Sequence, residues 1–249
     1  LSMMGPKTKL VAIVHVSNAI GTVNPIEAII AKARENGIAT LIDCAQSIQH
    51  MPLDVQSMGC DFAVFSGHKM FGPTGIGGLY GKRPLLDKMR PYQGGGDMIS
   101  RVSFDGTTFK EPPSRFEAGT PHIAGAIGLG VALDYIESIG IENIFAYESQ
   151  LIEYAFNRLK SCQGVEIIGN PNHRSGAISF IMENAHPHDI GTILDTEGVA
   201  IRTGHHCCEP LMNRFGISAT TRASIAFYNN SDDIDVLVDS LAKVRTLFG

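Results

Sequence analysis

Short apolar runs alternate with helical spacing in the first half of the chain. Four runs have the length and composition of buried strands, at residues 9–16, 38–42, 61–65 and 76–80. Between the first two, residues 25–36 have helical spacing, with Pro25 at the start and Gly37 just past the end. Strands that alternate with helices predict an α/β fold, a mostly parallel sheet with helices on both faces.

The second half of the chain also combines helical spacing with short apolar runs, but in it the strands and helices do not alternate regularly. Four helices are expected, at residues 122–139, 144–160, 188–197 and 232–247. Four strands are expected, at residues 165–168, 177–181, 199–202 and 223–226. This order predicts a smaller α+β domain, so we expect two domains, residues 1–137 and 138–249. Residues 91–117 are glycine-rich and polar and fit neither pattern.

Composition narrows the class of protein. A chain of 249 residues with 44% hydrophobic and 18% charged residues is ordinary for a soluble globular enzyme. The net charge of −5 and the absence of a Lys/Arg-rich run argue against a nucleic-acid partner. No apolar stretch approaches the roughly 18 residues of a membrane span, so no membrane partner is expected. Five cysteines are too few for a disulfide framework, which favours a reducing, cytoplasmic setting.

Polar side chains gather where the predicted strands end. The candidates are Asn18, Asp43, Ser66, His68 and Lys69. Ligands of parallel α/β sheets bind outside the carboxyl ends of the strands, so we expect these residues to face one mouth.

Three motifs carry a family resemblance. The first is a strand end that runs into a glycine-rich turn, Ser66-Gly67-His68-Lys69-Met70-Phe71-Gly72-Pro73-Thr74-Gly75. The others are Asp43-Cys44-Ala45-Gln46 and Arg202-Thr203-Gly204-His205-His206-Cys207. Together they resemble the cysteine desulfurase family of pyridoxal phosphate enzymes. The short loop after Cys207 is closer to the SufS/CsdA branch than to the IscS branch.

The resemblance implies pyridoxal 5'-phosphate as the cofactor. Lys69 would bind its aldehyde covalently, and Asp43 would keep the ring nitrogen protonated. Gln46 would reach the phenolic oxygen, and Ser66 and His68 would contact the phosphate and the cofactor. Thr120 would reach the phosphate of a neighbouring subunit, which implies a homodimer.

The resemblance also implies the substrate-handling residues. Cys207 would be the nucleophile, in a cationic neighbourhood that favours a thiolate. Arg222 would hold the substrate carboxylate with help from Asn18, while Arg202 would support the cysteine loop. The implied reaction converts L-cysteine to L-alanine and leaves a persulfide on Cys207. The sulfur would pass to an acceptor of SufE or SufU type for iron–sulfur cluster assembly.

Other interpretations remain open at this point. Asp43 alone could be a helix N-cap, and either arginine could form a surface ion pair. His205 to Cys208 could suggest a metal, but four consecutive residues do not readily surround one tetrahedral ion, so no metal is expected. Cys208 departs from the small residue usual in relatives. It could form a strained vicinal disulfide, accept sulfur or only fill space.

Two alternative functions are compatible with the same motifs. A selenocysteine lyase, acting on L-selenocysteine, would use the same framework. Family members also carry a substantial portion before the equivalent of Leu10, so we expect the N-terminal part to be absent here. The chain could then be a catalytically incompetent fragment or an interaction module. A kynureninase or aminotransferase is less favoured because neither needs the cysteine loop.

Overall fold

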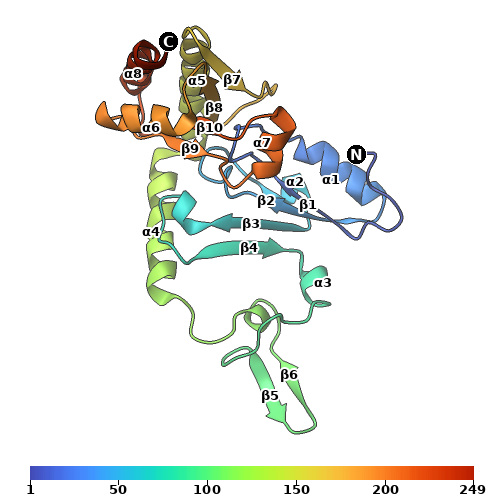
Figure 1. Ribbon diagram of the computed structural model, residues 1–249. Helices are drawn as coiled ribbons and strands as arrows, with labels where there is room; N and C mark the ends of the chain where they lie inside the picture. Colours follow the sequence, from blue (N-terminus) through green and yellow to red (C-terminus); the bar gives the residue numbers. More distant parts are fainter. The chain divides into compact units, whose positions relative to one another are not determined.

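A computed structural model describes residues 1–249 as two compact units (Figure 1). The first unit comprises Leu1–Ile13, Ile26–Ala45 and Leu53–Ser138, and the second comprises Val14–Pro25, Gln46–Pro52 and Ile139–Gly249. Two short segments from the N-terminal half thus fold with the C-terminal half. The predicted domain boundary at residues 137 and 138 remains a prediction.

The sheet of the first unit has four strands in the order β1-β2-β3-β4. Their bounds are β1 Leu10–Val14, β2 Ala39–Asp43, β3 Phe62–Ser66 and β4 Gly77–Gly81. β2 and β3 are parallel, and β4 pairs antiparallel with β3. The connection from β3 to β4 holds only the 3-10 turn η1 (Gly67–Lys69), whereas a parallel return needs about a dozen residues or more. The predicted α/β fold with a mostly parallel sheet is confirmed, with β4 as its antiparallel strand.

Four helices and a 3-10 turn accompany this sheet in the first unit. They are α1 (Ile26–Glu35), α2 (Val55–Met58), α3 (Arg83–Leu86), α4 (Ile123–Ile139) and the 3-10 turn η2 (Ser114–Phe116). Ile26 and Ile30 of α1 pack with Ile42 of β2 and Ala63 of β3 in one buried cluster. The helical spacing in residues 25–36 therefore marked the face that is buried.

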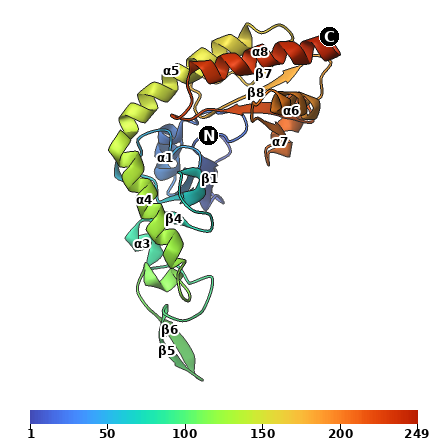
Figure 2. The ribbon, with the colours of Figure 1, turned by 90° about the vertical axis from the view of Figure 1, so that its left-hand side faces the viewer.

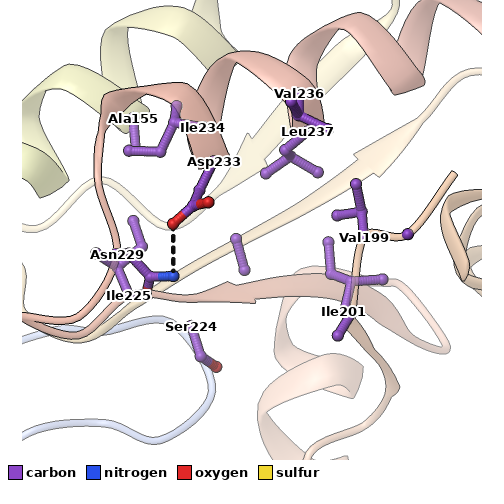
Figure 3. A pocket seen from close by; sticks show the side chains of 13 residues that line it. Ala155, Val199, Ile201, Ser224, Ile225, Asn229, Asp233, Ile234, Val236 and Leu237 are labelled. Carbon is purple, nitrogen blue, oxygen red and sulfur yellow. Dashed lines mark hydrogen bonds between the residues drawn. The ribbon is translucent and has the colours of Figure 1, made fainter.

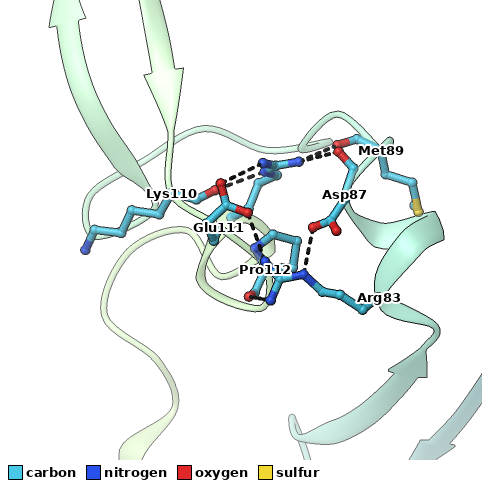
Figure 4. A network of polar contacts seen from close by, with 7 residues as sticks. Arg83, Asp87, Met89, Lys110, Glu111 and Pro112 are labelled. Atoms are coloured by element: carbon cyan, nitrogen blue, oxygen red, sulfur yellow. Dashed lines mark hydrogen bonds and ion pairs between the residues drawn. The ribbon is translucent and has the colours of Figure 1, made fainter.

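A hairpin lies in the stretch for which the sequence predicted no regular element. Its strands are β5 (Ile99–Ser103) and β6 (Gly106–Phe109), paired antiparallel. Eight of these nine residues are exposed, so no apolar alternation marks them. Figure 4 shows the polar contacts at its base, where Arg83 bonds Asp87 at 2.7 Å and Glu111 at 2.9 Å.

The second unit has an antiparallel sheet in the order β7-β8-β10-β9. Its strands are β7 Val165–Ile168, β8 Ala177–Met182, β9 Arg202–Gly204 and β10 Thr220–Ser224. The bounds predicted for the last two strands were wrong. The strand expected at residues 199–202 lies further along the chain, at Arg202–Gly204, and the strand expected at 223–226 lies earlier, at Thr220–Ser224. Val199, Ile201 and Ile225 pack against the core from outside the hydrogen-bonded ladder, so their apolar character misplaced both strands.

Four helices complete the second unit. They are α5 (Ile141–Lys160), α6 (Pro187–Thr196), α7 (Glu209–Phe215) and α8 (Ser231–Phe248). α8 contacts both α5 and α6, and Figure 2 shows α5 and α8 side by side. The core of this unit includes Phe180 of β8, Leu159 of α5 and Leu241 of α8, all fully buried. α7 was predicted as loop because its seven residues are too few to show a period.

No single helix of the chain is long and apolar enough to cross a membrane, and only the bent pair of α4 and α5 passes a test of length and composition.

Candidate functional site

Two candidate residues lie at the carboxyl ends of neighbouring parallel strands in the first unit. Asp43 ends β2 and Ser66 ends β3, with Asp43 in register with Val64. Asp43 Oδ1 accepts a hydrogen bond from the Ala45 backbone N–H at 2.9 Å. The following residues form a turn, so Asp43 is not a helix N-cap. Its carboxylate instead ends a strand at the edge where α/β folds bind ligands.

The turn that carries Lys69 is held by backbone hydrogen bonds. The Gly67 carbonyl accepts from the N–H of Met70 at 3.0 Å and of Gly72 at 2.9 Å. The Met70 side chain is almost wholly buried and anchors the turn, while Lys69 is half-buried and His68 exposed. The amine therefore sits on a fixed turn directly after a central strand.

Glycines in and just after this motif lie where the backbone or a neighbouring side chain comes close. A Cβ on Gly77 would lie 2.3 Å from the carbonyl oxygen of Phe65. A Cβ on Gly67 would lie 3.0 Å from the Ile76 side chain. What approaches these glycines is the protein itself, because β4 and the turn pack tightly on β3.

Two further cofactor candidates lie apart from this turn along the chain. Thr120 is exposed in the loop that follows η2 and precedes α4. Gln46 is half-buried and begins the segment Gln46–Pro52 of the second unit. That the candidates at the strand ends lie together in one binding site remains a prediction.

The candidate nucleophile lies on a strained loop between β9 and α7 of the second unit. His206 and Cys207 have left-handed φ values of 54° and 60°. The His205 carbonyl accepts from Cys208 N at 2.8 Å, and His205 Nδ1 accepts from Cys207 N at 3.2 Å. Two consecutive non-glycine residues in this region of backbone space are costly and typical of functional sites. The result is an exposed Cys207 thiol at the tip of a fixed loop.

Asn18 braces this loop from a distant part of the sequence. Its Nδ2 donates to the His206 carbonyl at 2.7 Å, and its Oδ1 accepts from Cys208 Sγ at 3.4 Å. Its own carbonyl accepts from Arg222 Nη1 at 2.6 Å. One residue therefore positions both the cysteine loop and the candidate carboxylate clamp. The sequence suggested Asn18 only as an aid to substrate binding, because partners 188 and 204 positions away leave no local signal.

Arg222 and Arg202 make the surroundings of the loop cationic. They lie opposite each other on the adjacent strands β10 and β9. Burial lowers the pKa of Arg222 and the charge of Arg202 adds to this, while the Cys207 and Cys208 thiols act in the opposite direction. Arg222 Nε also donates to Ser224 Oγ at 3.2 Å, which helps fix the plane of the guanidinium.

His206 contributes no positive charge near neutral pH. Its side chain is buried, and Nε2 lies 2.8 Å from Thr220 Oγ1. Burial, followed by the charges of Arg222 and Arg202, lowers its pKa from 6.5 to about 4. The cationic character expected of the loop therefore comes from the arginines rather than from this histidine.

A buried His–Glu pair in the second unit was not found from the sequence. His50 Nδ1 lies 2.6 Å from Glu148 Oε2, and both side chains are almost wholly buried. The pair ties the segment Gln46–Pro52, which carries Gln46, to helix α5. Ninety-eight positions separate the two residues, so spacing along the chain does not reveal the contact.

A cavity of the second unit lies away from the candidate residues. Its volume is about 270 Å³, it lies between α8, β10 and residues 198–201, and Figure 3 shows the side chains that line it. Its walls are largely apolar, with Asp233 bonded to Asn229 at 3.1 Å. None of the candidate residues lines it. The cavity therefore offers no chemistry of the kind that the motifs indicate.

The fold and the candidate residues define an α/β protein with a lysine turn at a strand end and a separate, braced cysteine loop. The model of the class-V aminotransferase family matches residues 1–237. The chain belongs to this family.

Several named proteins, one of them of known structure, are similar to the chain. A probable cysteine desulfurase of Halalkalibacterium halodurans is 51% identical over 243 residues, 98% of this chain and 60% of that protein. A cysteine desulfurase of Cronobacter sakazakii is 48% identical over 249 residues, 100% of this chain and 61% of that protein. The crystal structure of the cysteine desulfurase CsdA from Escherichia coli superposes with a TM-score of 0.95 at 37% identity, covering 100% of this chain and 62% of that one. The chain thus spans about 60% of the length of the curated relatives it matches.

Proposed function

We propose that this chain provides the lysine turn and the cysteine loop of a pyridoxal-phosphate-dependent cysteine desulfurase. The reaction converts L-cysteine to L-alanine and leaves the sulfur as a persulfide on Cys207. The observation that carries the proposal is the exposed Cys207 on a strained loop that Asn18 braces beside Arg222. The names of the similar proteins support the same reaction.

The residues present fit pyridoxal 5'-phosphate. A carboxylate, a hydroxyl and a lysine amine end or follow two neighbouring strands, where α/β folds bind ligands. Lys69 would hold the aldehyde, Asp43 the ring nitrogen, and Ser66 with His68 the phosphate. Gln46 would contact the phenolic oxygen of the cofactor, and Thr120 would contact the phosphate of the cofactor bound to a second subunit. Once bound, the cofactor supplies an electron sink that allows the Cα proton of the amino acid to leave.

The remaining roles belong to side chains of the protein. Arg222 would bind the substrate carboxylate bidentately and so orient Cα, with Asn18 assisting and Arg202 supporting the loop. Lys69 would take the proton from Cα and return protons as alanine forms. The Cys207 thiolate would attack the substrate sulfur, forming the persulfide S–S bond as the carbon–sulfur bond breaks.

The fate of the sulfur and the setting are part of the proposal. An acceptor of SufE or SufU type would take the sulfur by thiol exchange for iron–sulfur cluster assembly. A homodimer in the cytoplasm is the expected setting. L-selenocysteine is an alternative substrate for the same residues, and comparing the turnover of the two amino acids separates the possibilities.

The test measures alanine and protein-bound sulfur after incubation with pyridoxal phosphate and L-cysteine. We expect the unchanged chain to release alanine and to carry reducible sulfur that depends on Cys207. Cys207→Ala should bind the cofactor yet yield neither product, and Lys69→Ala should yield neither because the proton carrier is gone.

Cys162→Ala is the matched control, because Cys162 is a free cysteine remote in sequence from the loop. This variant should behave like the unchanged chain. Alanine release by Cys207→Ala at the unchanged rate would overturn the assignment of the nucleophile.

A further inference from the structure

A second thiol stands directly beside the proposed nucleophile. Cys208 is half-buried, whereas Cys207 is exposed. Cys208 Sγ donates to Asn18 Oδ1 at 3.4 Å, so the residue that braces the cysteine loop also orients this thiol. Cys208 also packs against the buried apolar cluster that includes Met212, a contact that a small apolar side chain could make as well. The proposed reaction uses only the Cys207 thiol, so it gives no role to the second one.

The surroundings suit a sulfur anion on Cys208 as well as on Cys207. Arg222 is bonded to Asn18, the same residue that holds the Cys208 thiol. Charge on either cysteine sulfur raises the pKa of Arg222, so the guanidinium and both sulfurs influence each other electrostatically. A persulfide is more acidic than a thiol, so a guanidinium close by favours its anionic form. The partial burial of Cys208 would also keep a bound sulfur less accessible to stray thiols.

We propose that Cys208 is a second sulfur carrier, which takes the terminal sulfur from the Cys207 persulfide and frees Cys207 for another turnover. The proposal rests on the proposed desulfurase function as the source of the first sulfur. The Cys208 sulfur attacks the outer sulfur on Cys207, a new S–S bond forms on Cys208, and the old S–S bond breaks. The Cys208 proton ends on the departing Cys207 sulfur, so the step needs no oxidant or reductant.

Attack on the inner sulfur of the persulfide is the competing outcome. That reaction would expel sulfide and join Cys207 to Cys208 in a vicinal disulfide. The two Cα atoms are held about 3.8 Å apart by the peptide bond, below the roughly 4.4–6.8 Å that disulfides favour. Attack on the outer sulfur avoids this strained ring because the transferred atom lies further from the backbone. The geometry therefore favours transfer of sulfur over loss of sulfide.

The test counts bound sulfur atoms per chain by mass spectrometry after incubation with pyridoxal phosphate and excess L-cysteine, without an acceptor. The unchanged chain should accumulate two reducible sulfur atoms on the peptide that spans residues 203–214, and Cys208→Ala only one. Cys162→Ala, the control, should accumulate two. Two atoms on that peptide in Cys208→Ala, or never more than one in the unchanged chain, would overturn the proposal.

A second arm separates this proposal from the desulfurase reaction. Brief exposure to inorganic polysulfide loads the exposed Cys207 without turnover, and fragmentation of the peptide then locates the sulfur. The sulfur should move to Cys208 with time in the unchanged chain, and Cys207→Ser should leave Cys208 unloaded over the same period. Equal loading of Cys208 in Cys207→Ser, or sulfur that stays on Cys207, would contradict the relay. Transfer in this arm without alanine from L-cysteine would instead count against the desulfurase proposal alone.

Discussion

At the scale of single residues, Asn18 is the side chain on which the cysteine loop depends. Its amide donates to His206 O across 188 positions, and its backbone accepts from Arg222. These two hydrogen bonds of Asn18 follow from the tertiary structure, and its neighbours in sequence do not reveal them. The prediction that the loop carries reactive chemistry could be made from residue types alone, whereas the way in which the loop is held could not.

Replacing Asn18 with alanine should lower the free energy of unfolding by about 1–3 kcal/mol, because the His206 carbonyl loses its donor in a partly buried place. Urea denaturation measures the change. Asn36→Ala is the matched control: its Nδ2 also donates to a carbonyl at 2.7 Å, that of Lys32, but on an exposed surface. This variant should change the free energy of unfolding by no more than about 0.5 kcal/mol. Equal losses in the two variants would contradict the bracing role of Asn18.

His206 should make the stability of the protein depend on pH. Its pKa is about 4 when folded and near 6.5 when unfolded, so between these values the unfolded chain binds more protons. The free energy of unfolding should therefore fall as pH drops from about 6.5 to about 4. Urea denaturation across this window should show a smaller fall for His206→Gln, which lacks the titrating group. The same fall in both proteins would show that this histidine does not titrate as described.

At the scale of elements, the strands and helices of the α/β half follow from the sequence because each buries a regular apolar face. α1 and the strands β1 to β4 lie within a residue or two of their predicted bounds. The hairpin β5–β6 was missed because its residues are exposed, and α7 because it is short. β9 and β10 were misplaced because Val199 and Ile225 pack against the core although they lie outside the ladder. The apolar pattern along the sequence thus fails to locate an element that is exposed, that is very short, or whose apolar neighbours pack against the core.

Gly21 joins the Asn18 turn to the sheet of the second unit. It has a φ of 69°, and a Cβ there would lie 2.2 Å from the Ala177 carbonyl oxygen. Gly21→Ala should therefore destabilise the protein by well over about 1 kcal/mol, from strain and collision together. Gly37→Ala, with a φ of 65° and open space around it, carries the strain alone and should cost less. Thermal unfolding compares them, and equal losses would show that the contact with Ala177 does not matter.

At the scale of the whole molecule, the two units are not contiguous in sequence. The segment Gln46–Pro52 leaves the first unit and joins the second, where the buried pair His50–Glu148 holds it. A division drawn from the order of strands and helices along the chain could not foresee this, because the segment contains no helix or strand of its own.

Glu148→Ala should lower the free energy of unfolding by about 1–3 kcal/mol, because the buried His50 Nδ1 loses its partner. Urea denaturation again measures the effect. Glu153→Ala, at an exposed position of the same helix, should change the value by no more than about 0.5 kcal/mol. If the two variants were equally stable, the pair would not hold the segment in place.

Lys69 is proposed to hold pyridoxal phosphate at the end of β3, and a labelling experiment tests this role. The chain is mixed with the cofactor, reduced with borohydride and digested, and the peptide that carries the pyridoxyl group is identified by mass spectrometry. We predict the label on Lys69, its loss in Lys69→Ala and its retention in Lys110→Ala, a variant of an exposed lysine. Labelling spread equally over surface lysines, or unchanged in Lys69→Ala, would show that Lys69 does not bind the cofactor.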